Sequence, residues 1–299
     1  MSVIKLNNLT KDYGDGNGIF DISLEVAKGE TFGFVGTNGS GKTTTIRHIM
    51  GFLKSDGGTA SVLDMDAWTD SPEIKRSVGY VPGEIAFPDV KTGTDFLKIQ
   101  AEFLGITDMT YANYLIKTLQ LDPSANLKRM SKGMKQKTAL VAALMGDKEI
   151  LILDEPTTGL DPLMRASFME LIAEEKKKGR TIFMSSHLFE EIEDTCDRVA
   201  LIKDGRLIDI ADMEKIRYHN IKTYKIEFNN SNDYKQFYGS GFNVIRKQDN
   251  HNQVTVEIDD KNVNELFKAL KGLDVKFISE KRYDLEQYFN KFYIKGEQK

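Results

Sequence analysis

The chain has 299 residues, of which 40% are hydrophobic and 29% are charged, and its formal net charge is −4. This length exceeds that of one average domain, so we expect a core domain and a smaller second domain. The mild negative charge gives no electrostatic basis for a nucleic-acid partner, and a single cysteine, Cys196, excludes an internal disulfide and a cysteine-cluster metal site.

The first predicted elements are two strands, residues 4–9 and 19–26, in which apolar and polar side chains alternate as they do in half-buried strands. A polar, glycine-rich turn separates them, and we place Tyr13 in that turn. An aromatic ring there can offer its face to a purine base. Without other motifs, an ordinary loop tyrosine is the better interpretation.

A third strand, residues 31–35, leads into a glycine-rich turn and then the start of a helix. The segment fits the phosphate-loop pattern G-x-x-x-x-G-K-[ST] at every required position, and its residues are Gly36, Thr37, Asn38, Gly39, Ser40, Gly41, Lys42, Thr43 and Thr44. Such a loop closes main-chain N–H groups around phosphate oxygens, and the helix adds the positive end of its dipole. We expect Lys42 to pair with the β- and γ-phosphates and the Thr43 hydroxyl to ligate Mg²⁺. The agreement of motif, strand and helix argues against a glycine-rich turn with a chance lysine.

Helical periodicity dominates the next part of the chain. The first helix continues through residues 45–50, and the pair Gly57-Gly58 predicts a turn. After a short strand at residues 78–81, three helices are predicted between residues 92 and 146, which makes this segment a helical insertion between strands. Ser131 and Gly133 stand at the start of the third of these helices, where they can cap it or bind an anion. Taken alone, the cap is the better interpretation.

Two carboxylates, Asp154 and Glu155, end a strand of four apolar residues, 150–153. This pattern matches the second element of phosphate-loop hydrolases, in which an aspartate at a strand end holds the Mg²⁺ shell. Glu155 is placed to accept a proton from an attacking water. The alternative, a solvated loop entry, is disfavoured by the phosphate loop upstream.

A histidine also follows the end of a predicted strand. Residues 158–162 predict a turn before a helix, and residues 181–186 predict the next strand, after which His187 follows. Ligands of open α/β sheets bind at strand ends, and His187 is the only one of the four histidines at such a place. Residues 199–202 and 206–210 predict a closing hairpin.

The C-terminal segment is predicted to run strand, helix, strand, strand, helix, strand, which suggests a ferredoxin-like α+β unit. Its elements are expected at residues 223–228, 231–238, 243–247, 254–258, 263–270 and 275–279. A last helix, residues 285–292, presents Tyr288, Phe289 and Phe292. The aromatic content raises the question of an RNA-binding sheet, but the basic signature of such sheets is missing, so we expect these rings to pack in a core.

Together these segments resemble the ATP-binding subunit of an ABC transporter, and most closely the half-size ATPases of bacterial drug and peptide exporters. The resemblance covers about residues 1–213 and rests on several motifs in a fixed order. It implies an α/β fold, a phosphate-loop NTPase core of the ABC type with an N-terminal antiparallel β subdomain. We therefore expect an ATP-binding domain at residues 1–215, with its helical subdomain at about 92–146, and a C-terminal accessory domain at 216–299.

The resemblance also implies roles for individual residues, with ATP and Mg²⁺ as cofactors. Tyr13 looks like the adenine-stacking aromatic, Asp154 like the Mg²⁺ aspartate beside Thr43, Glu155 like the catalytic base and His187 like the switch histidine. Ser131 and Gly133 match the family signature. Residues 158–161, which end in Asp161, match the loop that crosses between subunits.

Two positions depart from the family pattern. The signature usually reads Leu-Ser-Gly-Gly-Gln, whereas this chain has Met130-Ser131-Lys132-Gly133-Met134 and keeps only the serine and the second glycine. Gly83 stands where the family normally has a glutamine that senses Mg²⁺ and relays to the membrane subunit. That role can pass to Glu84 or to a water molecule, and the sequence does not choose between them.

The resemblance implies an ATPase that dimerises around two ATP molecules, with a second copy of itself or a paralogous ATPase subunit, and drives export of a drug or peptide through a separate transmembrane permease. No apolar run reaches membrane-spanning length and the N-terminus lacks the apolar core of a secretion signal, so we expect a cytoplasmic protein held on the inner face of the membrane by the permease. Two alternatives stay open: a soluble ABC ATPase that acts on the ribosome or on nucleic acid, and an importer ATPase.

Overall fold

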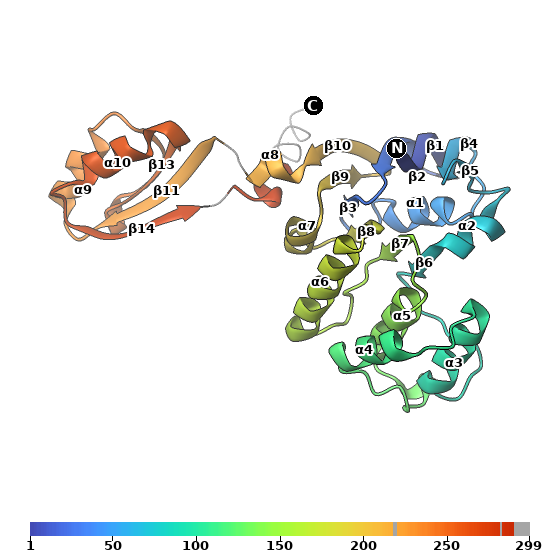
Figure 1. Cartoon of the computed structure of the whole chain (residues 1–299). Coiled ribbons are helices and arrows are strands. Elements are labelled where there is room, and N and C mark those ends of the chain that lie inside the picture. Colours follow the sequence, from blue (N-terminus) through green and yellow to red (C-terminus); the bar gives the residue numbers. More distant parts are fainter. Residues whose placement is uncertain (218–219, 282, 290–299) are drawn as a thin grey trace. The chain divides into compact units, whose positions relative to one another are not determined.

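The computed structural model describes residues 1–217, 220–281 and 283–289, and it divides into two compact units, Met1–Met213 and Glu214–Lys299 (Figure 1). Each unit forms its sheets and its buried core from its own residues. Within the described ranges, every helix is too short or too polar to cross a membrane.

The first unit contains two sheets. The antiparallel sheet has the order β2 (Asn17–Ala27), β1 (Ser2–Gly14), β4 (Gly57–Val62), β5 (Met65–Asp66). The larger sheet has the order β10 (Arg206–Asp212), β9 (Arg198–Lys203), β3 (Thr31–Val35), β8 (Thr181–Ser186), β7 (Ile150–Asp154), β6 (Val78–Val81), and only the β10–β9 pair is antiparallel. This arrangement confirms the predicted fold class.

One hydrophobic core of this unit lies between the two sheets and includes residues of α1 (Lys42–Ile49). Phe32 and Phe34 of β3 and Phe183 of β8 are fully buried there, and the ring centroids of Phe32 and Phe183 are 5.7 Å apart. Adjacent parallel strands buried on both faces read as continuous apolar runs, which is why β3, β7 and β8 were visible in the sequence.

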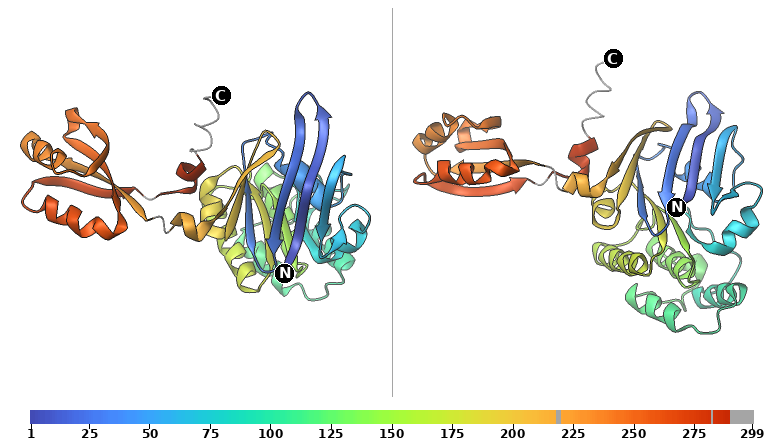
Figure 2. Two further views of the ribbon diagram at one scale, coloured as in Figure 1. Left: turned by 90° about the horizontal axis from the view of Figure 1, so that it is seen from above. Right: turned by 45° about the horizontal axis from the view of Figure 1, so that its top comes forward.

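The helical insertion is present as predicted. It consists of α3 (Gly93–Leu104), α4 (Thr110–Thr118), the short 3₁₀ helix η1 (Leu127–Arg129) and α5 (Lys132–Leu144), on the side of the parallel sheet opposite the antiparallel sheet (Figure 1 and Figure 2). Thr92 and Asp95 cap the start of α3 reciprocally. The remaining helices of the unit are α2 (Ser71–Ser77), α6 (Pro162–Lys177) and α7 (Phe189–Thr195), and α8 (Met213–Arg217) follows β10.

Two local predictions in the antiparallel sheet were wrong. Tyr13 lies in strand β1 rather than in the turn, which is formed by Asp15 and Gly16. The pair Gly57-Gly58 belongs to β4 rather than to a turn. Strand β1 pairs with β2 on one side and β4 on the other, and this pairing extends both strands through residues whose local preference is for a turn. Gly58 keeps a positive φ of 70°, and a Cβ there would lie 2.2 Å from the Asn8 carbonyl oxygen.

The second unit has the predicted order of elements. They are β11 (Ile221–Phe228), α9 (Ser231–Tyr238), β12 (Asn243–Gln248), β13 (Gln253–Asp259), α10 (Val263–Leu270) and β14 (Val275–Lys281). The sheet order β12-β13-β11-β14 is antiparallel throughout, as in a ferredoxin-like unit. Phe228, Tyr234 and Phe237 are buried in its core. Residues 285–289 are helical and bring Tyr288 against Phe289, whereas Phe292 lies outside the described residues.

The helical insertion is attached to α6 by two tyrosine–glutamate hydrogen bonds. Tyr111 of α4 donates to Glu175, which is fully buried and also pairs with Lys178 and Arg180. One turn further on, Tyr114 donates to the more exposed Glu174 across 2.7 Å. Burial, and then the hydrogen bond to Glu175, raise the pKa of Tyr111 well above its usual range, so its phenol stays protonated and donates.

We expect Tyr111→Phe to lower the free energy of unfolding of the full chain by about 1–3 kcal/mol, because a buried carboxylate loses a hydrogen bond. Urea unfolding followed by circular dichroism measures this change. Tyr114→Phe is the matched control, since it removes the corresponding bond at the surface, and it should cost much less. Equal losses in the two variants would contradict the importance given to the buried bond.

Candidate functional site

The site lies where three neighbouring parallel strands end. Strands β3, β8 and β7 are adjacent in the sheet, and their carboxyl ends lead into the phosphate loop, His187 and the pair Asp154-Glu155, respectively. Parallel strands that end at one edge bring residues far apart in the sequence together. The topology therefore unites the four side chains expected to act on phosphate, those of Lys42, Asp154, Glu155 and His187.

The phosphate loop folds around the ammonium group of Lys42. The Lys42 Nζ donates to the carbonyl oxygens of Gly36 at 2.7 Å and Thr37 at 3.1 Å, and the side chain is 6% exposed. Gly41 precedes α1 with a φ of 108°, which a residue with a side chain rarely adopts. Gly36 is required for a different reason, since a Cβ there would lie 2.3 Å from the Ile202 carbonyl oxygen.

Glu155 connects the loop to His187. One carboxylate oxygen, Oε1, lies 3.1 Å from Lys42 Nζ, and the other, Oε2, lies 2.6 Å from His187 Nδ1. The backbone of Glu155 has a φ of 49°, in the left-handed region, and its N–H donates to the Ser185 hydroxyl at 3.0 Å. Such a backbone persists only where its surroundings hold it. With Glu155 15% exposed and His187 42% exposed, the imidazole faces solvent while the carboxylate faces the loop.

Asp154 is fully buried and its two carboxylate oxygens differ. Oδ1 accepts a hydrogen bond from the Ser185 hydroxyl at 2.6 Å, whereas Oδ2 is buried without a hydrogen-bond partner among the described residues. A buried carboxylate oxygen needs a donor or a cation, and carboxylates are preferred ligands of Mg²⁺. Burial, and then the negative charge of Asp154, raise the pKa of nearby Tyr80 to about 12.

A cleft of about 290 Å³ opens beside Lys42 and Glu155. Its lining includes many of the predicted residues and consists of Tyr13, Asn17, Gly18, Asn38, Gly39, Gly41, Lys42, Thr43, Thr44 and Glu155. The Tyr13 ring is 55% exposed and therefore free to meet a flat ligand. Asn17 and Gly18 were not predicted from the sequence, because only the fold places the start of β2 against the phosphate loop.

Ser131, Gly133 and Asp161 do not line this cleft in the part of the chain that the structure describes. The Ser131 hydroxyl accepts from the Met134 N–H and caps α5, and Asp161 accepts from the Met164 N–H and caps α6. A Cβ on Gly133 would lie 2.6 Å from the Gly159 carbonyl oxygen. Gly133 is therefore packed against the 158–161 loop, whereas Ser131 is exposed at the start of α5.

Gly83 lies directly against Asp154. A Cβ at position 83 would be 2.9 Å from Asp154 Oδ2 and 3.2 Å from its Cγ. Real Cβ atoms essentially never approach another atom more closely than 3.0 Å. Glycine at position 83 thus has a steric reason, because a side chain at this position would have to displace the Asp154 carboxylate.

Comparison with known proteins identifies the family. The chain is 30% identical over 298 residues to the bacitracin transport ATP-binding protein BcrA of Bacillus licheniformis, and the match covers 97% of each chain. It belongs to the ABC transporter ATP-binding proteins. The family model described as ABC transporter matches residues 19–158 of this ABC ATPase. A second relative, the linearmycin resistance ATP-binding protein LnrL of Bacillus subtilis, is 34% identical, with 70% of this chain and 68% of the relative covered.

Solved structures agree with this assignment. An ATP-binding subunit of an ABC transporter is 30% identical with a TM-score of 0.65, and the match covers 72% of this chain and 92% of that one. A dimeric ATP-binding cassette bound to ADP and Pi shares the fold, with a TM-score of 0.62, 21% identity, and 70% of this chain and 98% of that chain covered. As a member of the ABC ATPase family, the protein binds ATP and hydrolyses it to ADP and phosphate.

We expect Gly83→Ala to lower the ATPase rate about tenfold or more, because a small displacement of an active-site group is costly. The added methyl would lie 2.9 Å from Asp154 Oδ2. Gly239→Ala is a suitable control, since the nearest atoms to its Cβ would be at 3.6 and 3.7 Å, which is ordinary contact. Steady-state phosphate release measures both variants, and an unchanged rate in Gly83→Ala would show that the space beside Asp154 is not needed.

Proposed function

We propose that this ABC ATPase powers the export of a drug or peptide through a separate membrane permease, to which it binds on the inner face of the membrane. The observation that carries the hydrolytic part is the contact of Glu155 with both Lys42 and His187 beside the cleft. The export part is supported by the names of relatives, which include bacitracin transport, linearmycin resistance and Nod factor export ATP-binding proteins.

Each side chain at the strand ends receives a role. Lys42 neutralises the β- and γ-phosphates of ATP, and Glu155 takes a proton from the attacking water while His187 holds its carboxylate. The Thr43 hydroxyl and Asp154 Oδ2 would hold Mg²⁺, and the metal would offset the charge that develops on the phosphates. The buried, unpartnered Oδ2 fits this group. The exposed ring of Tyr13 stacks on the adenine.

Ser131, Gly133 and Asp161 act on a second chain. They line no part of the cleft in the described residues of their own chain, and as the family signature and the crossing loop they serve the phosphates bound by a second copy or by a paralogous ATPase subunit. A fold neighbour is itself described as a dimeric cassette. The complete site is therefore shared by two subunits, each with its own phosphate loop.

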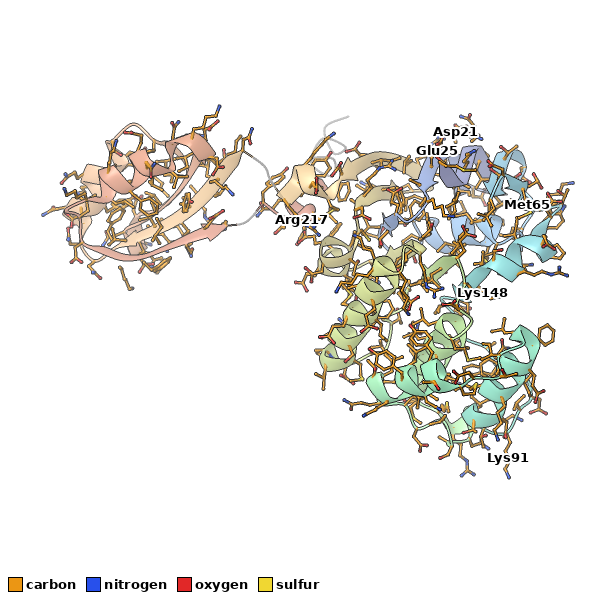
Figure 3. The ribbon with its side chains drawn as sticks, in the orientation of Figure 1. Asp21, Glu25, Met65, Lys91, Lys148 and Arg217 are labelled. Atoms are coloured by element: carbon orange, nitrogen blue, oxygen red, sulfur yellow. The ribbon has the colours of Figure 1, made fainter. Side chains whose placement is uncertain are left out.

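The permease docks at a second cleft, between the helical insertion and β6. This cleft has a volume of about 320 Å³ and is lined by Tyr80, Phe87, Phe96 and Lys148, the last of which is labelled in Figure 3. Beside it on α3, the Phe103 side chain is 89% exposed. An exposed ring beside a partly apolar cleft is suited to receive a cytoplasmic segment of a membrane protein.

We expect Glu155→Gln to bind ATP but to lose about 10²- to 10⁴-fold in turnover, because the amide cannot accept a proton from water. The γ-phosphate then stays between two subunits, so the variant should accumulate as an ATP-filled dimer. Size-exclusion chromatography with saturating Mg-ATP measures this directly.

Glu170→Gln, an exposed position of α6, is the matched control and should behave as the parent protein does. A Glu155→Gln protein that stays monomeric with saturating ATP, or that turns over at the normal rate, would contradict the assigned role.

A further inference from the structure

Ser185 contacts both residues of the carboxylate pair. It is the penultimate residue of β8 and is fully buried. Its hydroxyl donates to Asp154 Oδ1 at 2.6 Å and accepts from the Glu155 N–H at 3.0 Å. A serine hydroxyl has one proton to donate and two lone pairs to accept with, so these contacts fix the direction of its O–H bond.

The first of these bonds determines which oxygen of Asp154 remains available. With Oδ1 bonded to Ser185, Oδ2 is the oxygen that stays without a partner among the described residues, and it is the oxygen that faces Gly83. Without the hydroxyl, the carboxylate loses the hydrogen bond that restrains rotation about its Cβ–Cγ bond. The bond therefore selects one orientation of the carboxylate.

The second bond holds a backbone in a sparsely populated conformation. Glu155 has a φ of 49°, and its N–H has the Ser185 hydroxyl as acceptor. This conformation directs its side chain toward Lys42 and His187 at the distances given above. Releasing the N–H removes one of the restraints that keep a non-glycine residue in the left-handed region.

We propose that Ser185 is a positioning residue for ATP hydrolysis: one hydroxyl orients Asp154 toward Mg²⁺ and keeps Glu155 in place to act on water. This inference rests on the proposed roles of those two carboxylates. The next residue has a separate task, since Ser186 donates to Glu191 at 2.8 Å and accepts from the Leu188 N–H, which braces the loop that carries His187. Successive strand residues face opposite sides, so the two serines act on different parts of the site.

The test compares Ser185→Ala with Thr181→Val. Thr181 lies at the other end of β8, is also fully buried, and its hydroxyl accepts from the Gly29 N–H at 2.9 Å, so its variant loses the same kind of bond away from the site. Binding of a fluorescent ATP analogue is titrated with Mg²⁺ and repeated in EDTA. Outer-shell partners of metal ligands typically contribute 10- to 100-fold in metal affinity or activity.

We expect Ser185→Ala to need about tenfold more Mg²⁺ to reach half of the metal-dependent gain in affinity and to lose about tenfold in turnover. Its affinity in EDTA and its melting temperature should match those of Thr181→Val. An unchanged Mg²⁺ requirement would overturn the proposal, and so would equal losses with and without Mg²⁺, which indicate general structural damage. Asp154→Asn distinguishes a failure of the Ser185 proposal from a failure of the Mg²⁺ assignment. If Asp154→Asn keeps the Mg²⁺ requirement of the parent protein, Asp154 is not the Mg²⁺ ligand.

Discussion

The contact between Lys42 and Glu155 is the interaction on which the rest of the site depends. An ammonium group has three protons to donate, and Lys42 directs them among three oxygens, those of Gly36, Thr37 and Glu155. A phosphate oxygen of ATP can bind the Lys42 ammonium group only by replacing one of these three oxygens. Glu155 is the partner that is free to leave, since the two carbonyl groups belong to the loop itself. In the proposed mechanism, binding of ATP releases Glu155 toward water while His187 still holds its other oxygen.

Much of the fold was predictable because its central strands are buried on both faces and its glycines mark real constraints. The short apolar runs at residues 31–35 and 150–153 are typical of strands in a covered sheet, and Gly36 and Gly41 stand where space or φ excludes other residues. The errors arose where pairing between distant strands overrides local preference. Gly57 and Gly58 read as a turn locally, yet β1 supplies the partner that makes them part of a strand.

The site was predictable to the level of residue types but not of contacts. The sequence places four candidate residues at or shortly after strand ends, namely Lys42, Asp154, Glu155 and His187. The order of the strands then brings these residues to one edge of the sheet. The role of Ser185 could not be predicted from the sequence, because the sequence does not show which groups its hydroxyl contacts. Likewise, the sequence recorded the loss of a glutamine at Gly83, whereas the 2.9 Å approach to Asp154 needed the fold.

The proposed function requires a second chain to complete each site, and Gly133 is packed against Gly159 of its own 158–161 loop rather than against the cleft. The most direct measurement is the ATPase rate of the purified protein at saturating Mg-ATP over a range of protein concentrations that spans monomer and dimer. If two chains share each site, the rate rises faster than linearly with protein concentration. A strictly linear dependence, from a protein that remains monomeric throughout, would contradict it.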